Sequence, residues 1–185
     1  MKLTPTKIEK ITHEIEVKPF ISAYRNVGKY LQLCRQCDNF GRRWGCPPFD
    51  DNPQPCLERY EKVTVYMLKV YIEPAISQSQ CDMAKAMSNL VQAVRGQYEE
   101  EMLAEEAQRS GRAALFTGLC PHCGEAVCAR REGKQCRHPN LVRPSLEALG
   151  FNLCQISNEL FGTEILWAKD NRSPEYMCLI GAVFS

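Results

Sequence analysis

The chain has 185 residues, of which 44% are hydrophobic and 24% are charged, so it is long enough to bury its own core and we expect a single domain over residues 1–185. The formal net charge of +1 excludes a broad basic surface, so neither nucleic acid nor an anionic membrane is an expected partner. No run of 18 apolar residues occurs and residues 1–9 do not form an apolar signal region, so we expect a cytoplasmic protein outside the membrane.

The N-terminal part is predicted to contain one strand and one helix. Apolar and polar residues alternate over residues 11–17, which is typical of a half-buried strand, and Pro19 is expected to end it. His13 should face solvent on this strand. Residues 20–33 carry apolar side chains at helical spacing, which predicts a helix.

A first group of cysteines follows this helix within a loop over residues 34–56. Two adjacent prolines, Pro47 and Pro48, fix the backbone of this loop and remove two of its N–H donors, so the loop should be stiff. A stiff loop loses little conformational entropy when its thiolates bind a metal. The four candidate ligands of this group are Cys34, Cys37, Cys46 and Cys56.

The middle of the chain should contain a strand and the longest helix. The strand is predicted over residues 63–72, and the spacing of Ser77 and Gln80 is that of a capping box at the start of a helix of about thirty residues. An acidic, solvated end is expected over residues 99–106, with Gly111 as the stop. A short apolar run over 113–117 then leads into the next loop. The apolar stripe of the helix consists of Met83, Met87, Leu90, Val91, Val94, Tyr98 and Met102.

A second group of cysteines lies in a loop over residues 120–139. This group again has one Cys-x2-Cys pair and two single cysteines, so each loop holds enough thiols for one complete site. The four candidate ligands are Cys120, Cys123, Cys128 and Cys136. The other three cysteines, Cys81, Cys154 and Cys178, are expected to be structural.

The C-terminal part is predicted to contain helices over residues 143–150 and 153–161 and strands over 164–168 and 176–184. The last strand is apolar on both faces, so it should be central. The order of elements predicts an α+β fold, in which a mixed, mainly antiparallel sheet has the long helix on one face and the two cysteine loops at one end.

Eleven cysteines in a chain without a signal peptide are more typical of metal binding than of disulfides. A zinc ribbon supplies two Cys-x2-Cys pairs, whereas each loop here has one pair and two widely spaced single cysteines, which favours an iron–sulfur cluster. Zinc remains the alternative. Three basic residues beside the second group, Arg137, His138 and Arg143, are candidates to lie around the cluster and raise its reduction potential.

Two function classes follow from these patterns. The first is a protein that holds one or two [4Fe–4S] clusters and passes electrons to a redox partner protein. The second is a zinc-stabilised structural or interaction module without redox activity. The sequence contains no Ser/His/Asp set, P-loop or dinucleotide fingerprint, so any enzymatic role is that of an iron–sulfur-dependent oxidoreductase component.

Taken as a set, the motifs resemble those of a family of small prokaryotic proteins described as predicted metal-binding proteins of unknown function. The resemblance covers about residues 10 to 184 and implies metal binding by cysteine, with iron–sulfur as the expected chemistry. The residues that carry it are Cys34, Cys37, Phe40-Gly41, Trp44, Cys46-Pro47-Pro48, Cys120, Cys123, Cys136-Arg137-His138-Pro139 and Arg143-Pro144-Ser145-Leu146-Glu147-Ala148-Leu149-Gly150.

Overall fold

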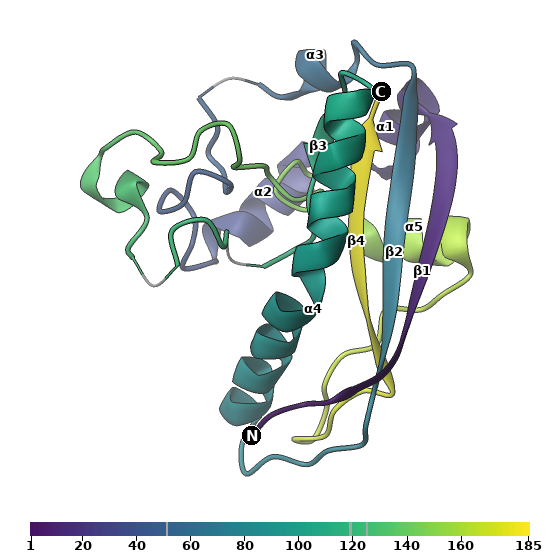
Figure 1. The fold of residues 1–185 in the computed structure, drawn as a ribbon, viewed down its shortest axis with the longest axis vertical. Coiled ribbons are helices and arrows are strands. Elements are labelled where there is room, and N and C mark those ends of the chain that lie inside the picture. The colour runs from purple at the N-terminus through teal and green to yellow at the C-terminus, as the bar shows by residue number, and fades with distance from the viewer. Residues whose placement is uncertain (51, 119, 125) are drawn as a thin grey trace.

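The computed structural model describes residues 1–50, 52–118, 120–124 and 126–185. Its centre is a four-stranded sheet in the order β1-β2-β4-β3, in which every neighbouring pair is antiparallel. The strands are β1 (Pro5–Glu16), β2 (Lys62–Ile72), β3 (Arg112–Ala114) and β4 (Tyr176–Phe184). The expected α+β class and the central position of the last strand are therefore confirmed (Figure 1).

Five α-helices and one 3-10 helix surround the described part of the sheet. They are α1 (Val17–Tyr24), α2 (Val27–Arg35), α3 (Gln54–Leu57), α4 (Gln80–Gln108), η1 (Ala129–Glu132) and α5 (Leu153–Phe161). The long helix α4 crosses one face of the sheet, and α1 and α5 lie on the other (Figure 1). Among the residues that the structure describes, no helix combines the length and the apolar character needed to cross a bilayer.

Helix α4 begins two residues later than the capping box at Ser77 predicted. Ser79, rather than Ser77, is the N-cap, and its hydroxyl accepts a hydrogen bond of 3.2 Å from the backbone N–H of Asp82. An N-cap of this kind satisfies one of the backbone donors that the first turn leaves without a partner. The apolar stripe is confirmed, because each of its residues is buried or packs against the buried cluster on this face.

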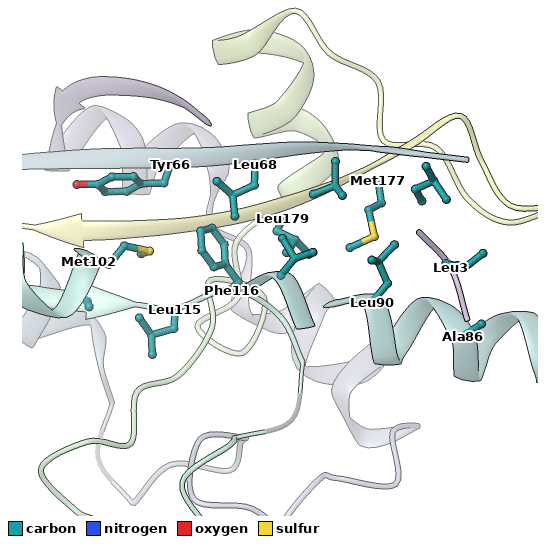
Figure 2. Close-up of a cluster of buried hydrophobic side chains, with 14 of the residues drawn as sticks. Leu3, Tyr66, Leu68, Ala86, Leu90, Met102, Leu115, Phe116, Met177 and Leu179 are labelled. Carbon is teal, nitrogen blue, oxygen red and sulfur yellow. The ribbon is translucent and has the colours of Figure 1, made fainter. Parts of the chain in front are cut away.

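The two central strands have two apolar faces because the sheet is covered on both sides. Alternate residues of β2 and β4, such as Leu68 and Leu179, pack against α4, and Figure 2 shows them with Leu90 from that helix. The residues between them pack against α1 and α5. Gly181 of β4 allows close approach, because a Cβ there would lie 2.8 Å from Met102 Cε.

The predicted helix over residues 20–33 is wrong, because the chain breaks at Arg25 and forms α1 and α2 instead. Arg25 pairs with Phe151 in an isolated antiparallel bridge, and the Asn26 N–H donates to the carbonyl of Gly150 at 2.8 Å. Asn26 then caps α2 through its side chain. The pattern of apolar residues could not show this break, since the partner lies more than a hundred residues away in the sequence.

Two further predicted elements do not form. Residues 143–150 do not form a helix, because Ser145 pairs in parallel with Leu115 and the Leu115 N–H donates to the carbonyl of Pro144, and residues 146–150 then make turns. Residues 164–168 have no ladder partner in the described sheet, so they are not a strand. The first strand is also longer than predicted. It starts at Pro5, and Pro19 lies in α1 rather than ending the strand.

Candidate metal centre

The two cysteine loops lie on the same side of the molecule and are joined by Arg130 (Figure 1). Its guanidinium donates to the carbonyl oxygens of Arg43 at 2.9 Å and Cys46 at 2.7 Å, and also to that of Pro48. The same guanidinium lies 5.0 Å above the ring of Trp44, whose indole N–H donates to the carbonyl of Lys134. One side chain of the second loop therefore fixes the backbone of the first.

Three cysteines of the first loop gather around one cavity of about 390 Å³. Cys34 lies in the last turn of α2, and the following turn brings Cys37 back through a hydrogen bond of 3.0 Å from its N–H to the Cys34 carbonyl. Burial, together with the charges of Cys37 and Cys34, raises the pKa of the Cys46 thiol to about 11. Negative charge on Cys37 and Cys34 therefore opposes ionisation of Cys46, and a bound cation would favour it.

Cys56, the fourth candidate of the first group, lies elsewhere. It is in the short helix α3, with its N–H donating to the carbonyl of Pro53, and it is not among the residues that line the cavity. Cys56 lies near Tyr60, whose pKa is raised first by burial and then by the charge of Cys56.

The other three cysteines of the second loop act on Cys120. Burial raises the pKa of the Cys120 thiol, and the charges of Cys123, Cys136 and Cys128 raise it further. Cys128 is the N-cap residue of η1. Cys120 also lines the cavity of the first group, so the two groups of thiols adjoin each other.

The three basic residues predicted around the cluster take different positions. Arg137 lies 3.9 Å from the Cys123 sulfur through Nη1, and the backbone N–H of His138 lies 3.4 Å from the Cys136 sulfur. Arg143 instead forms an ion pair of 2.8 Å with Glu106 and lines the cavity of the first group.

The acidic end of α4, predicted to be solvated, is partly buried. Glu99 and Glu106 are 5% and 8% exposed. Glu99 pairs with Arg95, which lies one turn earlier in the same helix and lines the cavity, at 2.6 Å. Burial raises the pKa of the Glu99 carboxyl despite the opposing effect of Arg95. In the sequence, the helical spacing of these charged residues beside the apolar stripe could have indicated that they are buried.

Sequence reasoning also missed Glu147, which lines the cavity. Its Oε2 atom is buried and has no hydrogen-bond partner among the described residues. Burial raises the pKa of this carboxyl against the opposing hydrogen bonds of the Ser145 and Thr117 side chains, and its charge in turn raises the pKa of the Cys34 thiol. The nearby Gly118, at a φ of +128°, leaves the space that Arg95 occupies, since a Cβ there would collide with the guanidinium.

The remaining cysteines lie outside both groups. Cys178 is half-buried in β4, and burial raises the pKa of its thiol. Cys81 is exposed, and Cys154 is exposed on α5 rather than packed as a small apolar side chain.

The sulfurs are not arranged around a single ion. Among the residues that the structure describes, no group of three or more His, Cys, Asp or Glu side chains is placed to hold one metal ion. A zinc ion with bonds of about 2.3 Å needs its four sulfurs roughly 4 Å apart.

Comparison with known protein families agrees with the prediction that the chain binds metal. The family described as "Predicted metal-binding protein (DUF2284)" matches residues 21–184. No curated protein and no solved structure matches the chain.

Proposed function

The chain belongs to the family of predicted metal-binding proteins, and from this premise we propose that its two cysteine loops hold [4Fe–4S] clusters that carry electrons to a redox partner protein. The first site uses Cys34, Cys37 and Cys46, and the second uses the four cysteines of the other loop. The role of Cys56 as a metal ligand stays a prediction from the sequence.

The observation that carries this proposal is the arrangement of the first three thiols around a cavity. Cysteine thiolates are the ligands that hold iron–sulfur clusters, and uneven spacing in the sequence suits a body wider than an ion. The cavity of about 390 Å³ between Cys34, Cys37 and Cys46 supports a cluster over a single ion.

The chain's own residues would position the clusters and set their potentials. A bound cluster supplies one-electron chemistry. At the second site, the positive charge of Arg137 beside the Cys123 sulfur stabilises the more negative, reduced state, which raises the potential. Because Cys120 belongs to the second group and lines the cavity of the first, an electron has a short path from one site to the other.

Zinc is the second candidate, and the turn at Cys123 favours it. The Gly124 N–H donates to the carbonyl of Pro121 at 3.1 Å, and Gly124 has a φ of +56°. Tight turns of this kind form the knuckles of zinc sites. A zinc ion would shape the loops as an interaction surface and would carry no electrons.

Reduction under anaerobic conditions tests the proposal. Protein purified without oxygen should be brown, its visible absorption should bleach with dithionite, and the colour should return on oxidation. Stable absorption through this cycle, or a colourless protein that contains zinc, would reject the electron-transfer function.

A further inference from the structure

A second cavity, of about 330 Å³, adjoins the cysteine cavity, because Pro47 and Ala148 line both. We propose that this second cavity binds a small organic molecule that has one carboxylate and an apolar body, and that the Arg25 guanidinium holds the carboxylate. The proposal goes beyond electron transfer and does not depend on which metal the cysteines bind.

The walls of this cavity are mostly apolar. Val27 and Leu31 of α2 line one part of it, and Phe49 lines another. Apolar walls favour a ligand with an apolar body, because binding removes both surfaces from water. The volume lies near the lower end of ligand pockets, so the ligand has to be small. Three prolines complete the apolar wall, namely Pro47, Pro48 and Pro53.

Arg25 is the one charged side chain along this cavity among the described residues. Its Nε donates to the carbonyl oxygen of Leu149 at 2.7 Å and its Nη1 donates to Gln54 Oε1 at 2.6 Å, so both acceptors are neutral. Burial lowers the pKa of this guanidinium, and the charge of Glu58 opposes that shift. The Glu58 carboxylate, however, accepts its hydrogen bond from Gln54 Nε2 at 2.7 Å.

These contacts leave the guanidinium able to bind an anion. A partly buried cation with neutral partners is stabilised when a carboxylate reaches it, and a guanidinium can donate two parallel hydrogen bonds to one carboxylate. Nη2 of Arg25 donates to no acceptor in the described chain, and Nη1 keeps a second proton. Among the described residues, no Asp or Glu lines the cavity to repel such a ligand.

Contacts between distant segments shape the cavity before any ligand binds. The Asn26 N–H donates to the carbonyl of Gly150 at 2.8 Å, and a Cβ at Gly150 would lie only 3.0 Å from Val27 Cα. Pro47 and Pro48 restrict the backbone of the wall that the cavity shares with the cysteine loop. A preformed site loses less conformational entropy on binding, which favours a small ligand.

Isothermal titration calorimetry of the protein purified without oxygen tests the site with three probes. Benzoate has a carboxylate and an apolar body, benzyl alcohol has the body without the charge, and acetate has the charge without the body. Benzoate should bind saturably, and each of the other two should bind at least about tenfold more weakly. Benzyl alcohol as tight as benzoate would overturn the role of the carboxylate, and acetate as tight as benzoate would overturn that of the apolar body.

Variants assign benzoate binding to this cavity. Arg25→Gln should weaken benzoate binding at least about tenfold. Because Arg25 also holds Leu149, Val27→Asp is a second variant that keeps those contacts. Val27 is 42% exposed and is the first residue of α2, where a carboxylate is favourable for the helix, and the new charge should repel benzoate and compete for Arg25. Lys29→Gln removes an exposed charge from the same helix outside the cavity and should bind benzoate as the parent does. Circular dichroism shows that each variant is folded.

The outcomes separate this inference from the proposed function. A parent protein that does not bind benzoate saturably, or a folded Arg25→Gln or Val27→Asp variant with the parent's affinity, would overturn the carboxylate site. A loss of affinity in Lys29→Gln as large as in Val27→Asp would also overturn it, because general charge rather than this cavity would then attract benzoate. A colourless zinc protein that binds benzoate through Arg25 would remove the electron-transfer function and leave the carboxylate site in place.

Discussion

At the scale of single residues, the contact between Arg137 and the Cys123 sulfur links a side chain to a measurable potential. Arg137→Gln removes a positive charge 3.9 Å from that sulfur, so reduction should become harder and the midpoint potential more negative, with the cluster retained. Anaerobic redox titration measures this. Arg131→Gln, exposed in the same loop, is the control and should change the potential less. An unchanged or more positive potential in Arg137→Gln would speak against the assignment.

The thiols of the first group predict how metal binding depends on pH. With a pKa of about 11, Cys46 keeps its proton at neutral pH and has to release it when metal binds. Zinc affinity of the metal-free protein should therefore rise by about tenfold per pH unit for each proton released, as long as the pH stays below the thiol pKa. Competition with a coloured chelator at several pH values measures it. Equal affinities across the neutral range would refute this account of the site.

The ligand types could be read from the sequence, but their grouping could not. Clustered cysteines identify the chemistry, whereas the position of Cys56 in α3 depends on where the loop turns after Pro48. Glu147 gave no signal of its own, because only the fold shows that its carboxyl is buried beside Cys34. The partner of Arg143 was equally hidden, since Glu106 lies in a helix end that reads as solvated.

At the scale of elements, Glu106 connects α4 to the segment that returns from the second loop. Its carboxylate accepts hydrogen bonds from the Arg143 guanidinium at 2.8 Å and from the backbone N–H of Ala113 at 3.1 Å. Glu106→Ala leaves both donors without this acceptor, so the Tm should fall by roughly 6–12 °C. Glu100→Ala, exposed on the same helix, should change the Tm by no more than about 2 °C. Similar small shifts in both variants would show that the buried pair is not structural.

The second loop should lose its metal independently of the first. Cys123→Ser removes one sulfur from a group that has its own four, so metal content should fall by about one site while the first stays filled. Metal analysis of the purified variant measures this, with Cys154→Ala, exposed on α5, as the control that leaves the content unchanged. Full retention in Cys123→Ser would contradict the assignment of the second site.

Elements with a strong local pattern were predictable, and those defined by distant partners were not. The strand β2 and the helices α4 and α5 have regular apolar spacing over their length, and the structure places them as expected within a few residues. The break between α1 and α2 and the turns of residues 143–150 depend on pairing with Phe151 and Leu115, which no local window contains.

At the scale of the whole molecule, a sheet covered on both faces carries two cysteine loops that are joined by Arg130. The class of the fold followed from the order of the predicted elements, and the central position of the last strand followed from its two apolar faces. The contact between the loops did not follow, because an arginine that donates to three backbone carbonyls looks like surface charge in the sequence.

Iron, inorganic sulfide and zinc contents of protein purified without oxygen test the central claim most directly. We expect iron and sulfide in equal amounts, about four of each per occupied site, without stoichiometric zinc. About one zinc per site in a colourless protein without sulfide would contradict it.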